Sequence, residues 1–140
     1  MKYQYSLSQY ARRPAITVEL FGPEKSILIQ NALIDSGADY CVFNLEFAKY
    51  IGIDLEKAGA GNSVGIGGLE KIKTYFVEIE LKIKEFDDRI KIKAGFIDSP
   101  SVIALLGQDG FFDNYKINFE RNENFFEINP ATTSRGGFRT

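Results

Sequence analysis

An acidic residue, Asp35, directly follows a run of apolar residues and is itself followed by two small residues, Ser36 and Gly37. Three successive apolar residues, 32–34, are typical of a strand that is buried on both faces. Small neighbours allow backbone amides and a hydroxyl to approach the carboxylate. We therefore predict that Asp35 is held rigidly where a buried strand enters a tight turn. The alternative is an Asx turn, in which the carboxylate only caps its own loop.

The chain contains no histidine and a single cysteine, Cys41. Sites that depend on an imidazole, such as Ser/His/Asp triads, Cys/His pairs and His-ligated zinc, are therefore excluded. Acid–base chemistry near neutral pH then falls to carboxylates, lysine or tyrosine, and a carboxylate becomes a usable acid only where its surroundings raise its pKa. We expect Cys41 to be a small core residue, and we look for catalysis among the aspartates and glutamates.

The length of 140 residues, with 44% apolar and 26% charged residues, fits one compact domain. Lysine and arginine number 17 and the acids 19, so no broad basic field is available to hold nucleic acid. No apolar run has the length of a signal peptide core or a membrane span. We therefore expect a cytoplasmic protein that binds neither nucleic acid nor a membrane.

Alternation of apolar and polar residues predicts a domain built mainly of strands. The pattern is clearest over 72–83, where one face carries charged residues, and it continues over 90–96 after a turn. The strands predicted in this way cover residues 15–20, 26–34, 72–83, 90–96, 102–106, 117–119 and 125–128. The fold class is therefore all-β, a partly closed barrel in one domain.

Helices are few in this pattern. Asn44 is a good N-cap for a short helix from about Leu45 to Tyr50, and Gly52 lies where a left-handed residue ends a helix. A second short helix is predicted near 109–115. The glycine-rich segment 59–68 predicts a mobile hairpin tip that projects from the body.

Three motifs follow one another along the chain: ALIDSGADYCVF at 32–43, VGIGG at 64–68 and ALLGQDGFF at 104–112. In this order and spacing they resemble the retropepsin-like aspartic proteases, the single-domain relatives of the two-lobed pepsins. The resemblance covers roughly residues 14–129 and implies a single-domain retropepsin-like acid protease barrel with one or two short helices. Residues 1–13 then form an N-terminal arm, and residues 130–140 a flexible C-terminal tail.

The resemblance implies a homodimer, because members of this family pair two chains and each chain contributes one aspartate. Two carboxylates at hydrogen-bond distance cannot both ionise easily and so hold one proton between them, a general property of aspartic proteases. One carboxylate then acts as general base on water, and its protonated partner donates to the peptide oxygen. The implied function is an aspartic endopeptidase that cleaves peptide or protein substrates and needs no metal and no cofactor.

Residue roles follow from the same resemblance. Asp35 is the catalytic residue, while Ser36 and Gly37 support the active-site loop. Ser36 matches the hydroxyl residue that locks the two loops together across the dimer, and the Gly37 carbonyl matches the acceptor of a substrate amide. Ala38 would line a substrate pocket, and Asp39 would contact the substrate backbone beyond it.

The glycine-rich motif matches a flap tip that folds over bound peptide and excludes water. Its residues are Gly65, Ile66, Gly67 and Gly68. The alternative is a glycine-rich turn with no ligand. Leu105, Leu106 and Gly107 resemble the core signature beneath the active-site loop, and Ala104–Leu106 also echoes the apolar residues 32–34 that precede Asp35.

Two residues depart from the retroviral pattern. Gln108 stands where those proteins usually carry an arginine that supports neighbouring acids, and Val64 stands where their flaps usually have another glycine. A non-catalytic retropepsin-like dimerisation or peptide-binding module is therefore the main alternative, and a two-carboxylate glycosidase is a more distant one. Asp109 and Asp113, four residues apart, suit either a shared cation or, more simply, a capping role.

Overall fold

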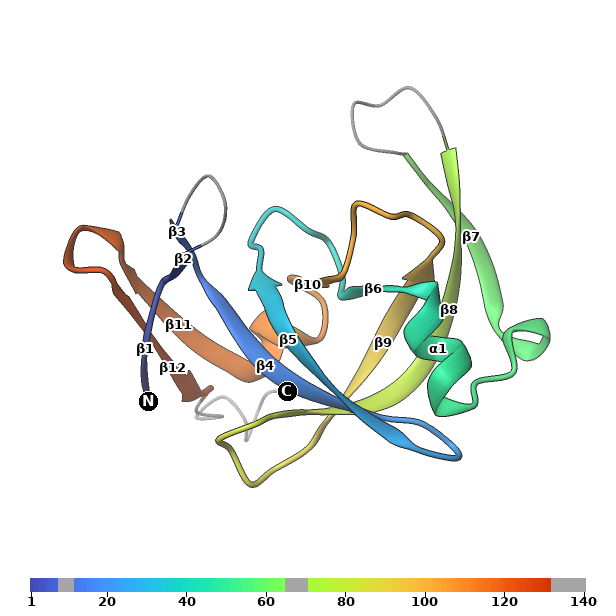
Figure 1. Cartoon of the computed structure of the whole chain (residues 1–140), viewed down its shortest axis with the longest axis horizontal. Helices are drawn as coiled ribbons and strands as arrows, with labels where there is room; N and C mark the ends of the chain where they lie inside the picture. Colours follow the sequence, from blue (N-terminus) through green and yellow to red (C-terminus); the bar gives the residue numbers. More distant parts are fainter. Residues whose placement is uncertain (8–11, 65–70, 132–140) are drawn as a thin grey trace, which may run out of the picture.

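Six strands close into a barrel in the computed structural model, which describes residues 1–7, 12–64 and 71–131. Their order around the barrel is β4-β5-β10-β6-β9-β8, and β8 also pairs with β4, so the ring is complete (Figure 1). The strands are β4 (Ala15–Phe21), β5 (Ser26–Ile34), β6 (Val42–Asn44), β8 (Lys71–Ile83), β9 (Ile90–Ile97) and β10 (Ala104–Leu106). The all-β barrel predicted from the sequence is confirmed.

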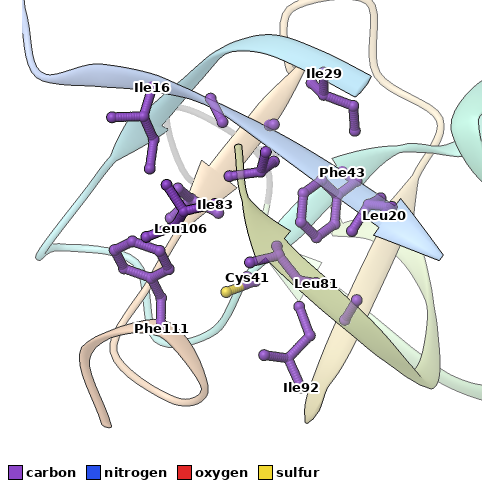
Figure 2. Close-up of a cluster of buried hydrophobic side chains, with 14 of the residues drawn as sticks. Ile16, Leu20, Ile29, Cys41, Phe43, Leu81, Ile83, Ile92, Leu106 and Phe111 are labelled. Atoms are coloured by element: carbon purple, nitrogen blue, oxygen red, sulfur yellow. The ribbon is translucent and has the colours of Figure 1, made fainter. Parts of the chain in front are cut away.

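The core fills the inside of this barrel. Residues of β4 alternate between buried and half-buried positions, as a strand with one face on the core requires. Every strand of the barrel contributes at least one buried side chain to the cluster in Figure 2, among them Leu20, Ile29, Phe43, Leu81, Ile92 and Leu106. Burial of these apolar surfaces is the main source of stability.

A β-bulge bends β5 against β4. Ile16 pairs with Ala32 and Val18 pairs with Ile29, so one residue of β4 faces two residues of β5. Asn31 takes the left-handed conformation there, with φ of 62°. A bulge increases the twist of a strand locally, and this curvature helps the sheet close on itself.

The two ends of the described chain form a separate three-stranded sheet. β1 (Lys2–Gln4) pairs with β12 (Phe125–Pro130), which also pairs with β11 (Tyr115–Glu120). Tyr5 follows β1 and is buried, with its ring edge-on to Phe126 at 5.4 Å. The first residues of the chain therefore pack against the hairpin that β11 and β12 form. β2 (Ser6–Leu7) follows this arm and pairs antiparallel with β3 (Arg12–Arg13).

The helix predicted after Asn44 is present as α1 (Leu45–Ile51). Asn44 accepts a hydrogen bond from the Glu46 amide at 3.0 Å, and Gly52 ends the helix with φ of 88°. The second helix, α2 (Phe111–Asn114), begins later than predicted, because Gly110 has a φ of 103°, which is not helical. Two 3-10 turns, η1 (Leu55–Lys57) and η2 (Arg121–Glu123), complete the helical residues of the described chain.

The prediction of a loose hairpin tip over 59–68 is wrong for its first part. β7 (Gly59–Val64) is a strand that pairs residue by residue with β8, from Gly59 opposite Phe76 to Val64 opposite Lys71. Strand pairing uses backbone groups, so a glycine-rich sequence can pair when its neighbour is well ordered. The second part of the segment, residues 65–68, lies outside the described residues.

None of the helices in the described ranges is both long enough and apolar enough to cross a membrane.

Asn44 also holds the loop that precedes β10, since its Nδ2 donates to the carbonyls of Ser99 at 2.9 Å and Val102 at 3.1 Å. We predict that Asn44→Ala lowers the free energy of unfolding by about 2–3 kcal/mol, because it removes a helix cap and two hydrogen bonds. Asn44→Ser keeps a side-chain oxygen that can cap the helix and loses only the two hydrogen bonds to these carbonyls, so its loss should be smaller. Urea denaturation measures the free energy of unfolding of both variants. Equal losses would show that the helix cap contributes nothing beyond the two hydrogen bonds to the loop.

Candidate active site

The candidate site lies where β5 and β10 leave the barrel. These two strands run parallel, with Leu33 opposite Leu105 and Ile34 opposite Leu106. The two similar apolar motifs noted in the sequence therefore lie side by side. Because the carboxyl ends of parallel strands meet at one edge of a sheet, the turn at Asp35 and the turn at Gly107 start next to each other.

Three hydrogen bonds fix Asp35 in its turn. Its amide donates to the Leu106 carbonyl at 3.0 Å, its own carbonyl accepts from the Ala38 amide at 3.1 Å, and Oδ1 accepts from the Gly37 amide at 2.9 Å. The tight turn and the Asx-type contact foreseen as alternatives thus occur together. Among the described residues, no donor lies within hydrogen-bond distance of Oδ2. Asp35 is half-buried, and the bond to Oδ1 fixes the orientation of its carboxylate.

The segment after β10 braces the Asp35 turn from the side. Backbone amides of Gln108 and Asp109 donate to the carbonyls of Ala38 and Asp39, at 2.9 and 2.8 Å. The Gln108 side chain also donates from Nε2 to the Ser36 carbonyl at 2.8 Å. Gln108, which the sequence marked as a departure, therefore supports the backbone of the turn.

In the described part of the chain, no cationic side chain forms an ion pair with Asp39. Its side chain is exposed, and the ion pairs found among the described residues are Lys49–Glu46, Lys57–Asp54 and Arg89–Glu80. Glutamine is neutral, so Gln108 cannot supply the positive charge that an arginine would. Its side-chain amide instead donates to the Ser36 carbonyl.

Gly107 is required by the close approach of the two turns. A Cβ atom at this buried position would lie 2.4 Å from the Tyr40 oxygen and 2.6 Å from the Ala38 oxygen. Both neighbours are backbone atoms and cannot swing aside. The absence of a side chain at residue 107 therefore sets the distance between the two segments of the site.

The other predicted site residues lie on the same turn. Ser36 and Gly37 are exposed and Ala38 is half-buried, and of the three it is the Gly37 amide that contacts the Asp35 carboxylate. Leu106 is fully buried beneath the turn, which fits the structural role expected of it. The four predicted flap residues, Gly65, Ile66, Gly67 and Gly68, lie outside the described residues.

The sequence did not identify two aromatic residues beside the site. The ring of Tyr40 meets Phe76 of β8 edge-on, with ring centroids 5.0 Å apart, and Tyr40 also forms a parallel bridge with Asp109. Together with Lys93 these residues line a cavity of about 180 Å³. The only signal available was the alternation along β8, which placed Phe76 on the side opposite Tyr75 and Val77.

Cys41 and the acidic pair after β10 take structural roles. Cys41 is fully buried, and burial raises the pKa of its thiol to about 11, so the thiolate needed for nucleophilic attack is scarce at neutral pH. Asp113 accepts a hydrogen bond from the Gly110 amide at 3.0 Å and thereby caps α2. Within the described ranges, no group of three or more acidic, cysteine or histidine side chains is arranged to hold a metal ion.

Comparison with known proteins decides which family this barrel represents. A family model described as "Aspartyl protease" matches residues 16–109, which is more than half of the chain and includes both turns of the site. The chain belongs to the aspartyl protease family. This membership argues against the glycosidase alternative. A search of curated proteins found no match.

Solved structures show that this aspartyl protease has a retropepsin-like fold. A retropepsin-like aspartic protease from Rickettsia conorii matches with a TM-score of 0.62 and 17% identity, over 92% of this chain and 98% of the other. The EIAV protease in complex with the inhibitor HBY-793 matches with a TM-score of 0.51 and 22% identity, over 72% of this chain and 86% of the other. The fold class predicted from the motifs is therefore confirmed.

We predict that Gly107→Ala lowers the free energy of unfolding of this aspartyl protease by about 1–3 kcal/mol, because the new methyl group collides with two carbonyl oxygens. Gly59→Ala is the matched control, since its Cβ would meet the Phe76 oxygen at an ordinary 3.8 Å. Urea denaturation compares the two variants. A control as unstable as Gly107→Ala would show that the loss comes from glycine replacement in general.

Proposed function

We propose that the chain is an aspartic endopeptidase that acts as a homodimer, with one Asp35 from each chain in a shared site. The observation that carries the proposal is the state of the Asp35 carboxylate: Oδ1 is fixed by the Gly37 amide, while Oδ2 has no donor among the described residues. A carboxylate held in this way is positioned to interact with a group outside its own loop, such as a water molecule or a substrate. Membership of the aspartyl protease family supports the same conclusion.

The proposed chemistry uses two carboxylates and one water. The two Asp35 side chains share one proton, because two neighbouring negative charges repel each other. The ionised carboxylate takes a proton from water as the water oxygen attacks the peptide carbonyl carbon, and the protonated carboxyl donates its proton to the carbonyl oxygen. When the tetrahedral intermediate collapses, the carbon–nitrogen bond breaks, the carboxyl that took the proton from water gives it to the departing nitrogen, and the other carboxylate takes a proton from a hydroxyl of the intermediate. The pair is thereby returned to its starting state with one shared proton. This sequence needs no histidine, and the chain has none.

The residues around Asp35 would share the remaining tasks. In this proposal Ser36 links the two turns across the dimer, the Gly37 carbonyl accepts a substrate amide, and Ala38 lines a pocket. Asp39, which is exposed beside the turn, contacts the substrate backbone. The predicted flap residues 65–68, which lie outside the described residues, would cover the peptide next to the paired strands β7 and β8.

We predict that Asp35→Asn lowers the rate of cleavage of a denatured protein by at least ~100-fold, because an amide cannot exchange the proton that the mechanism needs. The asparagine Oδ1 can still accept from the Gly37 amide, so the free energy of unfolding should change by less than about 1 kcal/mol. Cleavage is followed by gel electrophoresis and stability by urea denaturation.

Asp113→Asn is the matched control for this experiment. It also replaces an acid whose oxygen accepts a backbone amide hydrogen bond, but away from the Asp35 turn, and it should keep full activity. Undiminished cleavage by Asp35→Asn would refute the catalytic role of Asp35 and with it the aspartic protease mechanism. Loss of cleavage with retained peptide binding is expected, whereas a wild-type chain that binds peptides and never cleaves them would favour the non-catalytic module.

We predict that activity per chain rises with protein concentration until dimers saturate, because one chain supplies one Asp35. Sedimentation velocity over the same concentrations should show the monomer–dimer transition at the same midpoint. A roughly tenfold excess of Asp35→Asn chains should suppress wild-type activity. Most wild-type chains then form dimers with an Asp35→Asn chain, and these dimers have only one Asp35. Activity that stays proportional to concentration and resists this excess would assign the whole site to one chain.

A further inference from the structure

The Asp35 turn is a β-turn whose central peptide bond joins Ser36 to Gly37. The Ala38 amide donates to the Asp35 carbonyl at 3.1 Å, which closes the turn over residues 35–38. The central peptide of such a turn has two common orientations, types I and II, which differ by a rotation of roughly 180°. Type II needs a positive φ at the third residue, and glycine adopts a positive φ without steric cost. Because the third residue here is Gly37, both orientations are open to the Asp35 turn.

The structure has only one of these two orientations. The described glycines with a positive φ are Gly52 and Gly110, so the Asp35 turn is not of type II. In the observed orientation the Gly37 amide points to the Asp35 carboxylate and donates to Oδ1 at 2.9 Å. Rotation of the central peptide to type II would turn this amide away and bring the Ser36 carbonyl oxygen to the same side. The carboxylate would then lose the donor that fixes it.

Gln108 holds the opposite end of the same peptide. Its Nε2 donates to the Ser36 carbonyl oxygen at 2.8 Å. The described residues contain no cis peptide bond, so the Ser36 carbonyl and the Gly37 amide point in opposite directions from one rigid plane. This plane therefore carries two hydrogen bonds, one from Gln108 and one to Asp35. A donor on the carbonyl also polarises the peptide and strengthens its N–H group as a donor.

The backbone of Gln108 is fixed independently of its side chain. Its amide donates to the Ala38 carbonyl at 2.9 Å, and the Asp109 amide that follows donates to the Asp39 carbonyl at 2.8 Å. These bonds hold the residue beside the turn whatever side chain it carries. Gln108 is exposed, so a substitution there leaves no cavity in the core. The contribution of the side-chain hydrogen bond can therefore be measured separately.

We propose that Gln108 is a positioning residue for the Asp35 carboxylate, and that it acts by holding the Ser36–Gly37 peptide in the orientation that places the Gly37 amide on Oδ1. Gln108 acts through this peptide and needs no contact with a substrate. Its effect on cleavage rests on the proposed protease function, whereas its effect on the turn does not. The neutral residue at position 108 thus has a task of its own, which needs a donor and no charge.

The first test is Gln108→Met, which removes the donor and keeps a neutral side chain of similar length. The Gly37 amide should then exchange its proton with water about three- to tenfold faster, as measured by NMR. The kcat for cleavage of fluorescein-labelled casein should fall by a similar factor, while KM changes by less than about twofold. Gln108→Arg supplies N–H donors again and should return both values to within about twofold of wild type.

A second test adds Gln108→Met to a Gly37→Ala chain. Alanine disfavours a positive φ and so blocks the type II orientation, although its Cβ would lie 3.3 Å from Asp35 Oδ1 and move the carboxylate slightly. In this background Gln108→Met should change the amide exchange of residue 37 by less than about twofold. This comparison needs no activity.

Ser26→Ala is the matched control for both tests. It also removes an exposed side-chain hydrogen bond, from Ser26 Oγ to Glu19 Oε2 at 2.6 Å, but at the far end of β5. It should leave the Gly37 exchange rate and kcat unchanged.

Two results would overturn the proposal. One is equal exchange of the Gly37 amide in wild type and Gln108→Met, whatever happens to cleavage. The other is an equal effect of Gln108→Met in the wild-type and Gly37→Ala chains, which would show that Gln108 ties two segments together without selecting an orientation. A wild-type chain that cleaves nothing but shows the expected exchange rates would refute the proposed function and support the role of Gln108 in the turn.

Discussion

The hydrogen bond from the Asp35 amide to the Leu106 carbonyl joins two segments that are far apart in the sequence, and the rest of the site depends on it. It extends the parallel pairing of β5 and β10 by one residue beyond the barrel. The Asp35 turn is therefore held rigidly by the closed sheet. Gly107 has no side chain and so allows the two turns to approach each other. A catalytic group needs this kind of support, because a displacement of about 1 Å can cost two orders of magnitude in rate.

Local signals in the sequence were enough for much of the fold. The apolar run before Asp35 predicted a buried strand that ends there, and Asn44 with Gly52 marked both ends of α1. Long-range contacts were not visible. Gln108 braces a turn that lies 72 residues away, so the sequence showed it only as an unusual residue. The pairing of β7 depends on β8, so the sequence showed β7 only as a glycine-rich segment.

β8 has the largest number of neighbouring strands in the described barrel, and it reaches the candidate active site. Over its length it pairs with β7, β9 and β4. Phe76 pairs with Gly59 on one neighbouring strand and with Gly95 on the other, and its ring would lie 3.3 Å from a Cβ atom at Gly95. The edge-on contact with Tyr40 then joins this strand to the segment that follows Asp35.

The burial of Cys41 has a practical consequence for spectroscopy. The only thiol of the chain lies inside the barrel and stays protonated at neutral pH, so maleimide reagents will scarcely react with it in the folded protein. A cysteine introduced at an exposed position, such as Leu28 or Tyr50, can therefore carry a spin label or a fluorophore while the native thiol is kept. If the proposed dimer forms, distances between labels on its two chains would show how they are arranged in solution.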